Sequence, residues 1–148
     1  MKSSNKSDPV ILQGVYKTFH RTPTQRVNAL EAVSFTAQRN TLTALVGPDG
    51  AGKTTLLRMM AGLVLADEGT VHILGIQAAQ NPQAIQERIG YMPQKFGLYE
   101  DLTVQQNLDL YADLHGLSGA QRAQTYPNLL QMTDLTRFTH RLAGALSG

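Results

Sequence analysis

Residues 47–54 combine glycines, a lysine and a threonine at a spacing that can bind phosphate. They are Gly47-Pro48-Asp49-Gly50-Ala51-Gly52-Lys53-Thr54, which matches a glycine, any four residues, and then Gly-Lys-Thr. Glycines let the backbone curl so that successive N–H groups converge on one anion. Lys53 adds a positive charge for the β- and γ-phosphates, the Thr54 hydroxyl can bind Mg²⁺, and Thr55 can contact the α-phosphate. The pattern predicts binding of ATP, or a similar nucleotide, together with Mg²⁺.

The segments on both sides of this loop are those that phosphate binding requires. Residues 42–46 are nearly all apolar, which predicts a central strand covered on both faces. Residues 52–61 are helix formers with Leu56, Leu57 and Met60 on one side, and Gly62 stands where a left-handed C-terminal cap would lie. The positive end of this helix would add to the charge behind the loop amides. A glycine-rich turn that merely links strand to helix is the alternative interpretation.

Strands and helices also alternate elsewhere, which favours an α/β fold. Further strands are expected at residues 10–12, 33–36, 71–74 and 89–92, with an exposed hairpin-type connection at 20–26. Asn81-Pro82 opens a short helix that ends near Arg88. Thr103 with Gln106, and Ser118 with Gln121, are capping-box patterns that predict two later helices. We expect Pro127 to kink the second of these or to begin a new segment.

Composition limits the remaining functions. The 148 residues suffice for one domain or part of one, and charged residues make up only 16%, against roughly 25% in an average soluble domain. The net charge is +2 without a basic run, so no nucleic-acid partner is expected, and the absence of cysteine excludes disulfides and thiolate metal sites. Residues 59–66 are too short to span a bilayer, and residues 1–9 form a polar tail without a signal-peptide core. A cytoplasmic protein is the simplest expectation.

Two blocks of sequence together resemble the ATP-binding domain of ABC transporters. The first runs from Leu45 to Leu56 and contains the loop; the second is Gly90-Tyr91-Met92-Pro93-Gln94. The resemblance begins near Val10 and continues to the last residue. It implies an α/β P-loop NTPase core, whose partly parallel sheet has an antiparallel N-terminal β region, followed by the start of an α-helical subdomain. The implied division is 1–9 as a tail, 10–98 as the ATP-binding core and 99–148 as the helical subdomain of an incomplete nucleotide-binding domain.

The resemblance also assigns roles outside the loop. Gln94 would be the Q-loop glutamine, which contacts Mg²⁺ and the attacking water and would share catalysis with Lys53. Phe19 would stack on the adenine ring, with Tyr16 a weaker candidate; taken alone, Phe19 is more typical of a core residue. The terminal Leu146-Ser147-Gly148 resembles the opening of the signature motif, so that Ser147 and Gly148 would close over the γ-phosphate of the opposite subunit in a head-to-tail dimer.

The chain also departs from the family pattern. Asn40 replaces a glycine, although asparagine tolerates the left-handed backbone, and Pro127 is unusual in the helical subdomain. The family's Walker B aspartate, catalytic glutamate, D-loop and switch histidine would lie beyond Gly148. None of the carboxylates Asp101, Asp109 and Asp113 follows an apolar strand, so hydrolysis by this chain alone is not expected. The strands at 42–46 and 89–92 would lack full cover, which predicts a marginal or aggregation-prone piece.

Residues 90–104 are most similar to the multidrug-export branch of the family. This implies an ATP-binding subunit or domain that couples Mg-ATP binding and hydrolysis to export of a small molecule or drug. Its partners would be an ABC-2-type transmembrane permease, on the inner face of the cell membrane, and a second ATP-binding domain. The alternatives are an ABC ATPase that acts on ribosomes or DNA, a P-loop kinase, and an inactive nucleotide-binding module.

Overall fold

The chain forms two compact units, residues 1–91 and residues 92–148. The structure is a computed structural model that describes residues 8–20, 22, 25–94 and 97–146. In this part of the chain no helix is both long and apolar enough to cross a membrane. Each unit is described by itself below.

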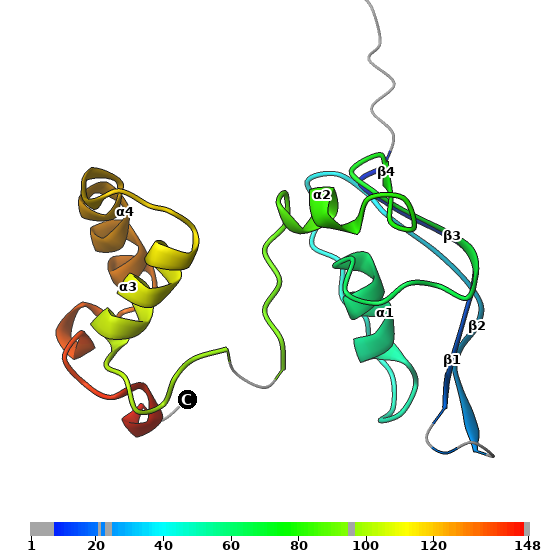
Figure 1. Cartoon of the computed structure of the whole chain (residues 1–148), viewed down its shortest axis with the longest axis horizontal. Helices are drawn as coiled ribbons and strands as arrows, with labels where there is room; N and C mark the ends of the chain where they lie inside the picture. Colours follow the sequence, from blue (N-terminus) through cyan, green and yellow to red (C-terminus); the bar gives the residue numbers. More distant parts are fainter. Residues whose placement is uncertain (1–7, 21, 23–24, 95–96, 147–148) are drawn as a thin grey trace, which may run out of the picture. The chain divides into compact units, whose positions relative to one another are not determined.

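The first unit is built on a four-stranded antiparallel sheet with the strand order β2-β1-β3-β4 (Figure 1). The strands are β1 (Val10–His20), β2 (Arg26–Ala37), β3 (Glu68–Ile73) and β4 (Ile76–Gln77). The predicted strands at 10–12 and 33–36 are confirmed as parts of longer strands, and His20 pairs with Arg26 across the predicted hairpin connection. This sheet is the antiparallel N-terminal β region that the sequence predicts.

A bulge in β1 directs two of its apolar residues into the same core. Leu12 and Val15 are three positions apart, yet both are fully buried, because the pairing register shifts between them. Gly14 lies in this bulge with φ 55°, and its N–H donates to Ser34 Oγ at 3.0 Å. The extra residue in β1 therefore restores the inward direction of Val15.

Two helices pack against this core (Figure 1). In α1 (Lys53–Met60) the buried residues are Leu56 and Met59. Leu56, Leu57 and Met60, which the sequence places on one side, line one cavity, although Leu57 is 46% exposed. A spacing of three residues keeps Leu56 and Met59 on one helical face. The helix ends at the predicted Gly62, whose φ is 68°.

The short helix α2 (Pro82–Gln86) adds the fully buried Ile85 to the same core. Its predicted start is confirmed: Asn81 Oδ1 accepts the N–H of Ala84 at 3.1 Å, and Pro82 occupies the first turn.

Two predicted strands are absent from the described residues. Residues 42–46 and 89–92 have no strand pairing, and Leu42, Val46 and Met92 are 100%, 90% and 93% exposed. A central strand needs neighbours for its amides and carbonyls, and no described strand lies against these segments. The predictions of buried strands here are wrong, whereas the predicted lack of cover is confirmed. Asn40, just before the first segment, has the expected left-handed backbone with φ 58°.

The second unit consists of helices. They are α3 (Val104–Leu114), α4 (Gly119–Met132) and the short 3-10 turns η1 (Thr136–Phe138) and η2 (Ala143–Ala145). Both predicted capping boxes are confirmed, at Thr103 with Gln106 and at Ser118 with Gln121. The prediction at Pro127 is a kink or a new segment; helix α4 continues through Pro127, so a new segment does not begin there, and the kink stays a prediction. Pro127 and Ala123, whose carbonyl loses its helical partner, are both exposed, so water can satisfy that carbonyl.

One buried polar residue fixes the chain in front of α3. Asn107 is 3% exposed, and its amide nitrogen donates to the carbonyls of Tyr99 at 3.0 Å, Thr103 at 3.1 Å and Leu102 at 3.3 Å. Its Oδ1 accepts the N–H of Tyr99 at 2.9 Å. A single side chain thereby satisfies the backbone of the turn at 99–103.

A charged residue has a comparable role in the first unit. Asp67, which precedes β3, accepts from Lys17 Nζ at 2.6 Å and from the N–H of Thr18 at 2.7 Å, while its own N–H donates to the Tyr16 carbonyl at 3.0 Å. The hydrogen bond from Lys17 and then the one from Thr18 lower the pKa of Asp67, and the charge of His20 acts in the same direction. Asp67 thus ties the far half of β1 to the start of β3.

Replacing Asn107 with alanine should lower the free energy of unfolding by about 2–3 kcal/mol, because the hydrogen bonds of a buried side chain to the turn at 99–103 are lost, including the partner of the Tyr99 N–H. Urea denaturation followed by circular dichroism measures the change. Gln106→Ala is the control, since it removes only an exposed cap and should cost about 1 kcal/mol or less. An Asn107→Ala loss no larger than the control would contradict the assigned role.

Replacing Asp67 with asparagine should make the Tm less sensitive to a fall in pH. The folded pKa lies below the ordinary carboxyl value, so the charge of Asp67 stabilises the fold above about pH 4 and loses this effect as the pH falls through the folded pKa. The difference in Tm between wild type and Asp67→Asn should shrink between about pH 5 and pH 2.5. Asp134→Asn, at a highly exposed carboxylate, is the control. A Tm difference independent of pH for Asp67→Asn would refute the stated cause.

Candidate nucleotide-binding site

The loop in front of α1 depends on two glycines with left-handed backbone. Gly50 and Gly52 have φ values of 80° and 84°. At Gly52 space is restricted as well: an added Cβ would lie 2.3 Å from the carbonyl oxygen of Ala29 and 2.9 Å from Cδ2 of Leu30. The loop therefore lies directly against β2, and only glycine fits at position 52.

The first turn of α1 offers unpaired amides at the end of this loop. The N–H of Leu56 donates to the Gly52 carbonyl at 2.9 Å, which is the i to i−4 bond of a helix. The amides of Lys53, Thr54 and Thr55 precede that bond, no side chain caps the helix, and its first turn contains no acidic residue. Such a helix start favours an anion.

The ammonium of Lys53 lies over the same loop. Its Nζ donates to the carbonyls of Gly47 at 2.7 Å and Pro48 at 2.6 Å, and the N–H of Ala51 donates to the Pro48 carbonyl at 3.3 Å. The positive charge of Lys53 is therefore held against the first two residues of the loop. Asp49 is exposed and is the acidic side chain of the loop.

Phe19 lies at the end of β1, on the part of the sheet that meets the loop. It pairs with Val27 of β2, and Ala29, two residues further along β2, contacts Gly52. Phe19 is 39% exposed, and Lys17 Nζ lies 5.5 Å from its ring centroid. Tyr16, the weaker candidate, is 40% exposed and pairs with Glu68 on the other side of β1.

The other predicted site residues belong to the second unit. Gln94 is exposed and has no strand before it. Ser147 and Gly148 lie outside the described residues. The structure thus packs the loop and the start of α1 against β2, and Phe19 lies on β1, which pairs with that strand.

Two residues beside Phe19, Lys17 and Asp67, belong to no motif of the sequence. Lys17 and Asp67 form an ion pair with a distance of 2.6 Å, although they are fifty positions apart in the sequence. No short motif contains both, so the only signal was a lysine two positions before an aromatic residue that shares its strand face.

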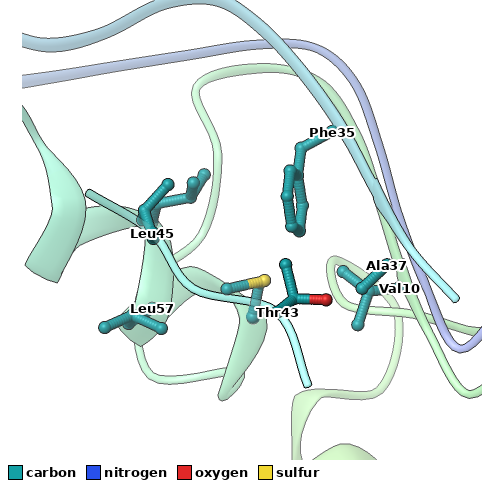
Figure 2. A pocket seen from close by; sticks show the side chains of 8 residues that line it. Val10, Phe35, Ala37, Thr43, Leu45 and Leu57 are labelled. Atoms are coloured by element: carbon teal, nitrogen blue, oxygen red, sulfur yellow. The ribbon is translucent and has the colours of Figure 1, made fainter. Parts of the chain in front are cut away.

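A cavity of about 390 Å³ in the first unit has a different chemistry (Figure 2). Its lining comes from β1, β2, α1 and the extended segment before the loop: Val10, Phe35, Ala37, Thr43, Leu45, Leu56, Leu57 and Met60. Thr43 is its one polar side chain, and no charged group faces it. This is a poor environment for a triphosphate, which leaves the loop as the candidate site.

The residues of the loop fit a nucleoside triphosphate with its metal. The loop offers amide N–H groups and an ammonium as donors to phosphate, and the Thr54 hydroxyl as a ligand of the metal. The lack of a Cβ at Gly52 lets the loop pack against Ala29 of β2. Within the described residues no group of three or more histidine or acidic side chains could hold a metal ion.

Comparison with known proteins gives the same family as the resemblance. The family model described as ABC transporter matches residues 30–148. The probable multidrug ABC transporter ATP-binding protein YbhF of Escherichia coli is 50% identical over 96% of this chain. The sulfate/thiosulfate import ATP-binding protein CysA of Nephroselmis olivacea is 35% identical over 94% of the chain. The chain spans 24% of the length of the first relative and 39% of the second.

Solved structures confirm the predicted fold class. The ATP-binding cassette MJ0796, in a dimeric post-hydrolysis state bound to ADP and Pi, is similar with a TM-score of 0.79 and 28% identity over 93% of this chain and 63% of that one. An ATP binding subunit of an ABC transporter gives a TM-score of 0.72 and 30% identity over 93% of this chain and 55% of the other. The chain therefore belongs to the ABC transporter family and is part of its ATP-binding domain.

Proposed function

We propose that residues 47–55 bind the triphosphate of Mg-ATP. The observation that carries this proposal is a left-handed Gly52 packed against β2 directly before the first turn of α1, a turn that has no side-chain cap and no acidic residue. The cassette MJ0796, which shares this fold, is described as bound to ADP and Pi.

Each part of the loop would have a separate task. Gly47, Pro48, Asp49, Gly50, Ala51 and Gly52 shape the backbone cradle. Lys53 would exchange the carbonyls of its own loop for the β- and γ-phosphate oxygens, a stronger partner because both groups are charged. Thr54 would bind the Mg²⁺ and Thr55 the α-phosphate. The metal, when bound, neutralises charge on the phosphate oxygens.

Phe19 and Gln94 would extend the site beyond the phosphates. The exposed ring of Phe19 offers an apolar face on which the base can stack. Gln94 would contact the Mg²⁺ and the attacking water, and Ser147 with Gly148 would complete the site of a second ATP-binding domain. The dimeric form described for MJ0796 supports this last role.

In the whole protein, residues 10–98 would form the ATP-binding core and residues 99–148 the start of the helical subdomain. We propose that ATP binding and hydrolysis drive export of a small molecule or drug through an ABC-2-type permease at the inner face of the cell membrane. The 50% identity to YbhF, which is named as a probable multidrug transporter protein, supports export.

Hydrolysis would need a base that this segment does not provide. In the second unit Asp109 accepts from the Tyr126 hydroxyl at 3.0 Å, and Asp113 pairs with Arg122 at 2.5 Å. Both interactions join α3 to α4, and neither carboxylate lies in the first unit, which contains the loop. We propose that residues 1–148 bind ATP without hydrolysing it.

Lys53→Ala should weaken Mg-ATP binding by at least about tenfold, because a charge-assisted contact to the phosphates is lost. Isothermal titration of the purified chain measures the affinity. Arg58→Ala removes an exposed positive charge from the other end of α1 and should leave the affinity within about twofold. Equal affinities of wild type and Lys53→Ala would remove the proposed site.

Gly52→Ala should abolish measurable ATP binding and lower the Tm, because its Cβ would collide with the Ala29 carbonyl and its φ is left-handed. Gly90→Ala is the matched control, since nothing lies within 4 Å of a Cβ at that position. Thermal unfolding with and without Mg-ATP measures both effects. A Gly52→Ala variant that ATP stabilises as well as wild type would be the contrary result.

A further inference from the structure

We propose that Lys17, fixed by Asp67, is a positioning residue that holds Phe19 ready to receive the nucleotide base. Lys17 and Asp67 would thereby raise the affinity that the base contributes. They would leave the affinity for the phosphates unchanged. This inference rests on the proposed ATP site and adds to it a determinant of base binding.

The contacts of Lys17 place its charge beside the Phe19 ring. The two residues are two positions apart on β1 and therefore share one face of the strand. Lys17 Nζ lies 5.5 Å from the ring centroid, within the range of a cation–π contact, and 2.6 Å from Asp67 Oδ1. Only 16% of the Lys17 side chain is exposed, and Phe19 is among the exposed large apolar residues. One side of the ring is thus covered by a held lysine, and part of the ring stays open.

Asp67 fixes β1 where its pairing is irregular. The register with β2 shifts on both sides of Lys17, and the register with β3 shifts between Gln13 and Tyr16. At this place Asp67 bonds the N–H of Thr18 at 2.7 Å and the carbonyl of Tyr16 at 3.0 Å. These bonds hold the backbone next to Phe19 as regular strand pairing would.

The Phe19 ring is also connected to the phosphate loop, through strand β2. Phe19 pairs with Val27, and the same strand β2 reaches Gly52 through Ala29. A ring held rigidly at a constant distance from the loop costs less entropy to order when a nucleotide binds. A nucleotide should therefore bind more tightly than a triphosphate without a base.

The test compares Mg-ATP with Mg-tripolyphosphate, which has phosphates but no base. Isothermal titration on the full chain uses wild type, Lys17→Met, Asp67→Asn and Phe19→Leu, with Lys17→Arg as the conservative variant. We expect Lys17→Met and Asp67→Asn to weaken ATP about three- to tenfold and tripolyphosphate by less than about twofold. Phe19→Leu should lose at least as much, and Lys17→Arg should retain most of the wild-type ATP affinity.

Arg39→Gln controls for the loss of a surface positive charge and should change neither affinity. The inference is overturned if Lys17→Met weakens both ligands equally, since Lys17 would then act on the phosphates, or if it leaves ATP binding unchanged. Asp67→Asn keeps an acceptor for Thr18 and carries the same test if Lys17→Met does not fold. Failure of the ATP site itself is distinguishable, because wild type would then bind neither ligand.

Discussion

The close approach of Gly52 to the Ala29 carbonyl is the constraint on which the first unit depends. Because no side chain separates the loop from β2, the start of α1 is fixed against the sheet. The same helix inserts Leu56 and Met59 into the core formed with β1 and β2. Packing of the apolar core and presentation of the loop amides are therefore two results of one contact. Position 52 needs glycine for two reasons: there is no space for a Cβ, and its backbone is left-handed.

Each unit also relies on one polar side chain at a place where regular backbone pairing stops. Asp67 bonds the irregular half of β1, and Asn107 bonds the turn that leads into α3. In both cases the side chain supplies bonds that a ladder or a helix would otherwise supply. These bonds fix where β3 and α3 begin, which burial of apolar residues alone does not specify. Polar satisfaction thus complements burial in specifying the fold.

Local signals predicted well, and signals that depend on distant partners did not. The caps at Asn81, Thr103 and Ser118 and the helix after the loop follow from residues within a few positions of one another. Strands at 42–46 and 89–92 could not be judged from apolar content, because a strand exists only with neighbours. The loop pattern was evident from its spacing, whereas the pairing of Lys17 with Asp67 depends on the meeting of β1 with the start of β3.

The uncovered run at 42–46 has a thermodynamic consequence for the neighbouring loop. It contains no charge, exposes Leu42 and Val46 to water, and leads directly into Gly47. Any polypeptide that adds a strand alongside it also restrains the first residues of the loop. A strand added at residues 42–46 that changed the affinity of the loop for nucleotide would, by linkage, have its own affinity changed by nucleotide by the same factor.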